Sequence, residues 1–188
     1  YALKQGIFPL TFGGLWEADG TYIPGVRDCL VIAKDLKTGF VLGGAIGETE
    51  DEDVCATAYK EALSVARKNP KILRIDGGSA LRSAAEKVFG KNVKIVINPR
   101  IGRMSQNQSI EAFFSNLEVF FKIRRGLHSK NHALTVLRGF IYHWNFVRPS
   151  QTFGGKTPAE NAGLKYFRIW YPNPWVLLIP VSYTHLTL

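Results

Sequence analysis

Cysteine and long apolar segments are scarce in this 188-residue chain. Its two cysteines, Cys29 and Cys55, have neither metal-ligand spacing nor a neighbouring histidine, so we interpret both as reduced, buried thiols without a structural disulfide. This usage favours an intracellular location. The longest apolar run, Trp175–Ile179, falls far short of the roughly 18 residues that suggest a membrane span. A disulfide scaffold is thereby excluded, and no membrane partner is expected.

Acidic residues are also scarce, but only in the second half of the chain. Residues 1–90 contain 11 Lys or Arg against 12 Asp or Glu, whereas residues 91–188 contain 13 against 3. A strongly cationic half of this kind indicates a polyanionic partner. An ordinary solvated basic surface would give the same counts, so charge alone does not decide between the two interpretations.

The hydrophobic pattern predicts strands and helices in a mixed order. The predicted strands span residues 15–23, 29–33, 40–46, 72–75 and 93–97, and the predicted helices span about 51–67, 79–88, 106–122 and 131–146. The first three strands are expected to form an antiparallel meander, and the last two follow helices and are expected to be parallel. This order predicts an α/β fold of the ribonuclease-H-like type, a five-stranded mixed sheet flanked by helices.

Three carboxylates fall on elements that this topology brings together. Asp19 lies within the first strand, Asp76 directly follows the fourth strand, and Glu111 lies in the first turns of the long helix. Open α/β sheets bind ligands where strands end beside helix starts. Each carboxylate alone has another explanation, as an exposed strand residue, a turn or cap, or a complement to a helix dipole. Together they would repel one another unless a cation neutralises them.

An oxygen-rich site of this kind suits Mg²⁺ or Mn²⁺ rather than zinc. Two such ions about 3.5–4 Å apart would polarise a phosphodiester and stabilise its entering and leaving oxygens. The attacking group would be water in a cleavage step and a 3′-hydroxyl in a strand-transfer step. The acids at 48–53 are an alternative cation site, but they are better interpreted as the start of a helix.

Six short motifs follow one another along residues 15–164: Trp16–Thr21, Ile75–Gly78, Asn107–Phe114, Arg125–Ser129, Tyr142–Pro149 and Gly155–Glu160. In this order they resemble the signatures of bacterial insertion-sequence transposases of the DDE superfamily, which are related to retroviral integrases. The resemblance implies that Asp19, Asp76 and Glu111 are catalytic metal ligands and that Asn107 assists near the substrate phosphate. The chain departs from the family pattern at Glu118, where Lys or Arg is usual, and at Ala112, where many relatives have Arg.

A basic zone extends beyond the third carboxylate. It comprises Lys122, Arg124, Arg125, Lys130 and Arg138. We predict that it contacts the DNA backbone, because such contacts give salt-sensitive, sequence-independent affinity. A solvated basic face is the alternative.

The resemblance also implies a function and a domain organisation. The expected activity is metal-dependent DNA cleavage and strand transfer during transposition, by a homo-oligomer assembled on element ends and target DNA in a prokaryotic cytoplasm, associated with the nucleoid. Residues 1–12 are expected to link to an N-terminal DNA-binding region, residues 13–165 to form the catalytic core, and residues 166–188 to be a partly non-native tail. A catalytically impaired DNA-binding remnant and a purely hydrolytic ribonuclease-H-like nuclease remain open as alternatives.

Overall fold

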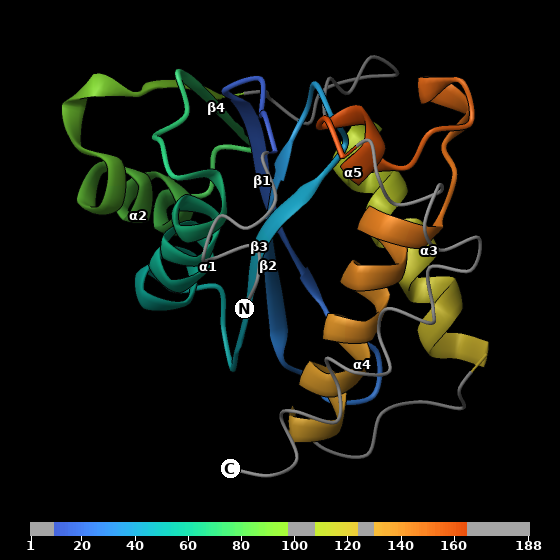
Figure 1. Cartoon of the computed structure of the whole chain (residues 1–188). Coiled ribbons are helices and arrows are strands. Elements are labelled where there is room, and N and C mark those ends of the chain that lie inside the picture. Colours follow the sequence, from blue (N-terminus) through green and yellow to red (C-terminus); the bar gives the residue numbers. More distant parts are fainter. Residues whose placement is uncertain (1–9, 98–107, 124–129, 165–188) are drawn as a thin grey trace, which may run out of the picture.

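A single sheet organises the chain, and helices cover both of its faces (Figure 1). The computed structural model describes residues 10–97, 108–123 and 130–164. The strands are β1 (Leu15–Tyr22), β2 (Cys29–Asp35), β3 (Val41–Gly47), β4 (Ile72–Ile75) and β5 (Lys94–Ile97). Their spatial order is β3-β2-β1-β4-β5. The expected five-stranded mixed sheet is confirmed.

The pairing of the strands follows their connections. β1 with β2 and β2 with β3 are antiparallel, because short turns join them. β1 with β4 and β4 with β5 are parallel, which requires helical crossovers. Asp35 holds the β2–β3 turn, since its Oδ2 accepts hydrogen bonds from the Thr38 amide at 3.0 Å and the Thr38 hydroxyl at 2.8 Å. Gly39 completes this turn with a φ of 73°.

Helices α1 (Glu52–Ala66) and α2 (Ser79–Phe89) cover one face, and a short 3₁₀ turn, η1 (Gly90–Asn92), leads from α2 to β5. Asp51 caps α1 by accepting a hydrogen bond from the Val54 amide at 2.9 Å. The predicted end at residue 67 is confirmed, since Arg67 adopts the left-handed C-cap conformation. Trp16 of β1, which is fully buried, packs edge-to-face on Phe89 with 5.7 Å between ring centroids.

Helices α3 (Gln108–Ile123) and α4 (Lys130–Tyr142) form the second set, on the other side (Figure 1), whereas the buried Ala159 of the short helix α5 (Pro158–Asn161) belongs to the apolar cluster of α1 and α2. The apolar stripe expected for α3 is confirmed: Ile110, Phe113 and Leu117 are buried against the sheet. Phe113 also meets Trp144 with 5.0 Å between ring centroids. The two sets of helices therefore bury separate apolar clusters on the two faces.

The end of α4 differs from the prediction. The helix was expected to continue to residue 146, but it changes after Tyr142 into a π-helical turn, η2 (His143–Val147). This turn directs the Asn145 amide to β3, where it accepts from the Val41 N–H and donates to the Val41 carbonyl, both at 2.9 Å. The helical spacing of apolar residues does not predict this turn, because the turn depends on hydrogen bonds to the backbone of β3. The 3₁₀ turn η3 (Gln151–Phe153) then leads to α5.

Candidate active site

Asp19 lies on the face of β1 that α3 covers. Side chains alternate along a strand, so Trp16 and Ala18 point to α1 and α2 while Glu17 and Asp19 point the other way. Asp19 is only 7% exposed, and its Oδ1 accepts a hydrogen bond from the Gly20 amide at 2.9 Å. Burying a carboxylate is unfavourable unless partners offset the loss of hydration. Asp19 is therefore a buried carboxylate in the middle of a core strand, on the side that faces α3.

Asp76 directly follows β4, the strand that lies parallel to β1. Gly77 turns the chain with a φ of 100°, and the Gly78 amide donates to Asp76 Oδ1 at 3.0 Å. The β1–β4 register pairs Glu17 with Arg74. Extended by two residues, this register brings Asp19 level with Asp76. Asp19, midway along β1, therefore lies beside the carboxyl end of β4, which Asp76 follows.

Glu111 lies in the first turn of α3 and is exposed. It lines a groove of about 480 Å³ together with Thr21 and Tyr22, the residues that end β1. The negative charges of Asp19 and Glu111 both help to raise the pKa of Glu17. These observations place Glu111 beside the end of β1.

Asp19 is thus level with Asp76, and Glu111 lies near the end of β1, but the three carboxylates do not form a closed metal cage. Within residues 10–97, 108–123 and 130–164, no three His, Cys, Asp or Glu side chains gather closely enough to hold a metal ion. The donors are nevertheless all carboxylate oxygens, the ligands that Mg²⁺ and Mn²⁺ prefer. Asp19, Asp76 and Glu111 therefore fit a hard divalent cation by their chemistry.

Glu50 is a fourth acid at this end of the sheet, and the sequence did not single it out. A Cβ atom added to Gly78 would lie 3.2 Å from Glu50 Oε1 and 3.3 Å from Asp76 Oδ1. A Cβ atom added to Gly20 would clash with the Glu50 carboxylate. The interpretation of this acidic stretch as a helix start is confirmed for Asp51, but Glu50 packs over the two glycines instead. The only feature of the sequence that pointed to a neighbour such as Glu50 was the glycine that follows each of Asp19 and Asp76.

Glu17 is a buried carboxylate between two cations. It is 1% exposed, and neither of its side-chain oxygens has a hydrogen-bond partner. Arg74 Nη1 lies 4.0 Å from Glu17 Oε1, and Lys34 is its neighbour across the β1–β2 pairing. Burial raises the pKa of Glu17 to about 7; the charges of Lys34 and Arg74 oppose this rise, and those of Asp19 and Glu111 add to it. The face of the sheet below α3 therefore buries a carboxylate between two cations and near two further acids.

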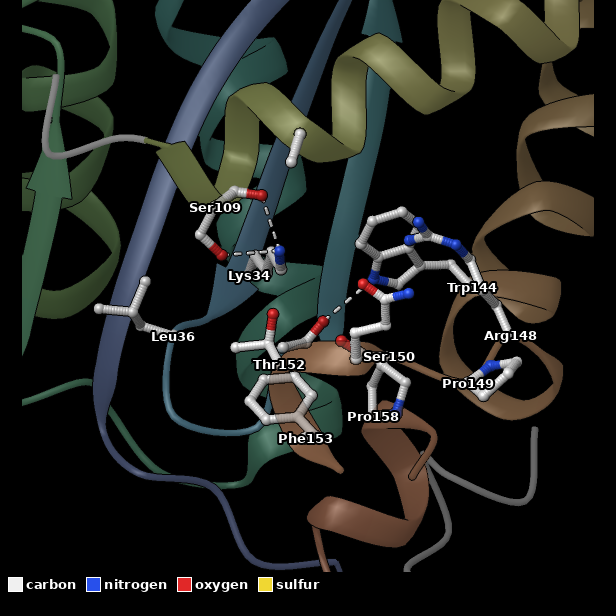
Figure 2. A pocket seen from close by; sticks show the side chains of 13 residues that line it. Lys34, Leu36, Ser109, Trp144, Arg148, Pro149, Ser150, Thr152, Phe153 and Pro158 are labelled. Carbon is white, nitrogen blue, oxygen red and sulfur yellow. Dashed lines mark hydrogen bonds between the residues drawn. The ribbon is translucent and has the colours of Figure 1, made fainter. Parts of the chain in front are cut away.

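Lys34 joins β2 to the start of α3 (Figure 2). Its Nζ donates to the backbone carbonyl and the hydroxyl of Ser109, both at 2.8 Å. Burial lowers the pKa of Lys34 to about 8, the Glu17 carboxylate opposes this, and the charge of Arg148 adds to it. Ser109 precedes Glu111 by two residues, so Lys34 fixes the turn that presents the third carboxylate. The sequence did not predict this contact, which spans 75 residues.

The predicted basic zone is only partly within the described residues. Lys122 is exposed at the end of α3 and pairs with Glu118, with 2.8 Å between Nζ and Oε1. Arg138 is exposed on α4 and lines a hollow beside Gly44 of β3. Asn107, Arg124 and Arg125 lie outside the described residues, as does the side chain of Lys130. A common DNA-binding surface remains a prediction.

Comparisons with known proteins connect this arrangement to one fold. No family model and no curated protein matches the sequence. Among solved structures, the catalytic core of BIV integrase aligns with a TM-score of 0.57 and 18% identity, over 79% of this chain and 93% of that one. The magnesium-bound dimeric core of HTLV-2 integrase aligns with a TM-score of 0.59 and 16% identity, over 82% and 98%.

A larger assembly gives the same result. A chain of the simian T-cell lymphotropic virus intasome, solved with a PP2A regulatory subunit, aligns with a TM-score of 0.64 and 16% identity, over 82% of this chain and 55% of that one. The chain therefore has the ribonuclease-H-like fold of integrase catalytic cores. In the described part of the chain, no helix is long and apolar enough to cross a membrane.

Proposed function

We propose that this chain is the catalytic core of a DDE-type polynucleotidyl transferase, which cuts DNA and joins the freed strand to a target, as a bacterial insertion-sequence transposase does. The observation that supports this most is that Asp19 lies level with Asp76 on neighbouring strands of a sheet with the integrase-core fold, while Glu111 lines a groove beside the end of β1. The sequence motifs that surround the same three residues support it independently.

Asp19, Asp76 and Glu111 would hold the divalent cations, Mg²⁺ or Mn²⁺. When bound, two such ions polarise a phosphodiester and stabilise its entering and leaving oxygens. The HTLV-2 integrase core, which shares the fold, was solved in complex with magnesium.

The chain's own residues hold these carboxylates in place. Asp19 belongs to a strand paired on both sides, and Asp76 is oriented by the Gly78 amide. Ile110 and Phe113 bury one side of α3, and Lys34 ties its first turn to β2. Fixed groups lose little entropy when substrate binds, so this rigidity promotes reaction between aligned oxygens. Lys34 is thus a positioning residue for Glu111.

DNA is the substrate and partner that we propose for the cationic half of the chain. Residues 91–188 contain 13 Lys or Arg against 3 acids, which suits a phosphate backbone. Neighbours of the same fold were solved as a dimer and as part of an intasome. We therefore propose a homo-oligomer on DNA, because joining two element ends to a target requires more than one active site.

A plasmid assay tests the proposal. The full chain is incubated with supercoiled plasmid and a labelled oligonucleotide that ends in a 3′-hydroxyl, with MgCl₂ or with EDTA. We expect Mg²⁺-dependent nicking and joining, and we expect Asp76→Asn to lower both on the order of 10³-fold, which corresponds to ~4 kcal/mol of lost transition-state stabilisation. Asp53→Asn, an equal charge change on exposed α1, should retain activity.

Each other outcome favours one alternative. Nicking without joining would identify a purely hydrolytic nuclease. Activity of the wild type no greater than that of Asp76→Asn would reject the enzyme and leave the DNA-binding remnant, to which Glu118 in place of the usual cation also points. Equal losses in Asp53→Asn and Asp76→Asn would show that the loss is not specific to the site.

A further inference from the structure

A second hollow lies on the other side of the first turn of α3 from the Glu111 groove. This cavity, here named the Lys34 cavity, has a volume of about 770 Å³ and opens between β2, α3 and the segment that follows η2 (Figure 2). Ala112 lines it, whereas Glu111, the preceding residue, lines the groove beside β1. Consecutive residues of a helix point about 100° apart. The two hollows therefore flank a single helical turn.

The charge of the Lys34 cavity is of one sign. Lys34 and Arg148 are the ionisable residues among its described lining residues, and none of these is a carboxylate. Lys34 is 3% exposed, and burying a cation is unfavourable. Its Nζ lies 5.2 Å from the centroid of the Trp144 ring, and the Arg148 guanidinium carbon lies 4.3 Å from it. Two cations thus share one aromatic ring at the wall of the cavity.

The wall that presents these cations is held rigidly. Trp144 Nε1 donates to the Gly39 carbonyl at 3.1 Å, and Asn145 clamps the same π-helical turn to Val41. π-helical turns occur frequently at functional sites. Opposite this wall, Thr152 is exposed and Phe153 is partly buried, so the rim has both a hydroxyl group and an apolar surface. A fixed guanidinium with nearby hydroxyl groups suits a phosphate, which arginine binds through paired hydrogen bonds.

We propose that the Lys34 cavity binds a phosphodiester of the DNA strand whose reacting phosphate lies at Glu111. The proposal rests on the proposed function, because the strand must pass the first turn of α3 to reach both hollows. Each strand of duplex DNA has one phosphate per ~3.4 Å of helix axis, so a strand at Glu111 has neighbouring phosphates near Ala112. Arg148 and Lys34 would anchor one of these phosphates, and Phe153 would contact the adjacent sugar or base.

A binding measurement without divalent cations tests this site separately from catalysis. The full chain is titrated with a fluorescein-labelled DNA duplex in EDTA, and the anisotropy is followed between about 50 and 200 mM salt. We expect Arg148→Gln to weaken binding roughly tenfold and to reduce the salt slope by about one phosphate contact. The matched control is Arg82→Gln on exposed α2, where Arg82 pairs with Glu86 at 3.1 Å. It should change neither quantity appreciably.

A second variant is needed because Arg148 also packs on Trp144. Misfolding of Arg148→Gln would weaken DNA binding as well. Thr152→Asp places a negative charge on the exposed rim without removing a buried contact, and we expect it to weaken binding at least as much as Arg148→Gln. Equal reductions of the salt slope in Arg148→Gln and Arg82→Gln would overturn the proposal, because the effect would then be general electrostatic attraction. Unchanged affinity in Thr152→Asp would overturn it too.

The two proposals fail in distinguishable ways. If the plasmid assay shows no Asp76-dependent activity while Arg148→Gln and Thr152→Asp lose affinity, the cavity binds DNA and only the enzymatic proposal fails. If nicking and joining depend on Asp76 but both cavity variants bind DNA like the wild type, the cavity proposal alone fails.

Discussion

The two faces of the sheet bury polar groups of different kinds. Beneath α1 and α2 the buried thiols are neutral, because burial raises the pKa of Cys29 to about 11 and that of Cys55 to about 12. The buried carboxylate on this face, Asp35, accepts hydrogen bonds from backbone amides. Beneath α3, Glu17, Asp19 and Lys34 are ionisable groups that are buried beside the proposed site. One face is therefore built for stability, whereas the other accepts unfavourable charge burial where the proposed chemistry lies.

Two buried carboxylates, Asp35 and Glu17, differ in their hydrogen bonding. Asp35 is fully buried and accepts hydrogen bonds from the amides of Gly13, Gly14 and Thr38 and from the Thr38 hydroxyl. Glu17 is equally buried, and its oxygens accept none. Asp35 therefore stabilises a turn, whereas Glu17 stores unfavourable electrostatic energy next to Asp19.

The largest effects should come from apolar truncation on either face. Leu73→Ala below α1 and α2 and Ile32→Ala below α3 each remove a fully buried side chain. We expect each to lower the free energy of unfolding by about 3 kcal/mol, measured by urea denaturation. A much smaller loss for Ile32→Ala would show that the α3 face does not belong to the cooperative core.

Removing the charge of Glu17 should have the next largest effect, and the effect depends on pH. Burial raises the pKa of Glu17 from 4.5 to about 7, so between these values the folded chain keeps a proton that the unfolded chain has lost. Stability therefore falls as the pH rises through this window, by on the order of 2–3 kcal/mol from this group. We expect Glu17→Gln to abolish this part of the decline, measured without divalent cations because Asp19 is nearby.

The control for this titration is Glu86→Gln on the exposed side of α2, where Glu86 pairs with Arg82. It should change the free energy of unfolding by less than about 0.5 kcal/mol at any pH. If Glu17→Gln shows the same pH dependence as the wild type, Glu17 does not titrate in this window and the contrast between the two faces is weaker than the structure indicates.

The smallest effect is expected at the exposed end of α3. Lys122 and Glu118 form an ion pair whose side chains are 67% and 51% exposed, so its contribution to stability is small. Glu118→Gln should leave the free energy of unfolding within about 0.5 kcal/mol of wild type. It should strengthen DNA binding roughly twofold, because Lys122 loses a competing acid. Weaker DNA binding in this variant would place Lys122 outside the DNA surface.

Much of the fold was predictable because local patterns specify it. Alternation and short apolar runs bounded by turn residues located all five strands, and β4 was predicted at its observed bounds, Ile72–Ile75. The end of α4 was not predictable, because it depends on hydrogen bonds between Asn145 and the backbone of Val41, 104 residues away in the sequence. The sequence also did not show that Trp144, which is buried, forms a wall of the Lys34 cavity.

The candidate site divides in the same way. Asp19, Asp76 and Glu111 were found from the sequence because each lies at a recognisable point of a strand or helix, with a motif around it. Glu50 and Lys34 were not, because their importance depends on what lies across the sheet. Glu50 was grouped with the helix-starting acids, and only the packing over Gly20 and Gly78 separates it from them.

The sequence by itself determined the order of strands and helices, the three carboxylates and the cationic second half, since these depend on local patterns and composition. Only the tertiary structure decided that Lys34, Glu17 and Arg74 lie side by side across three strands and that Lys34 holds the turn of Glu111. The physical reason is strand register: a shift of one residue would turn every side chain to the opposite face, and register is fixed by packing between distant segments.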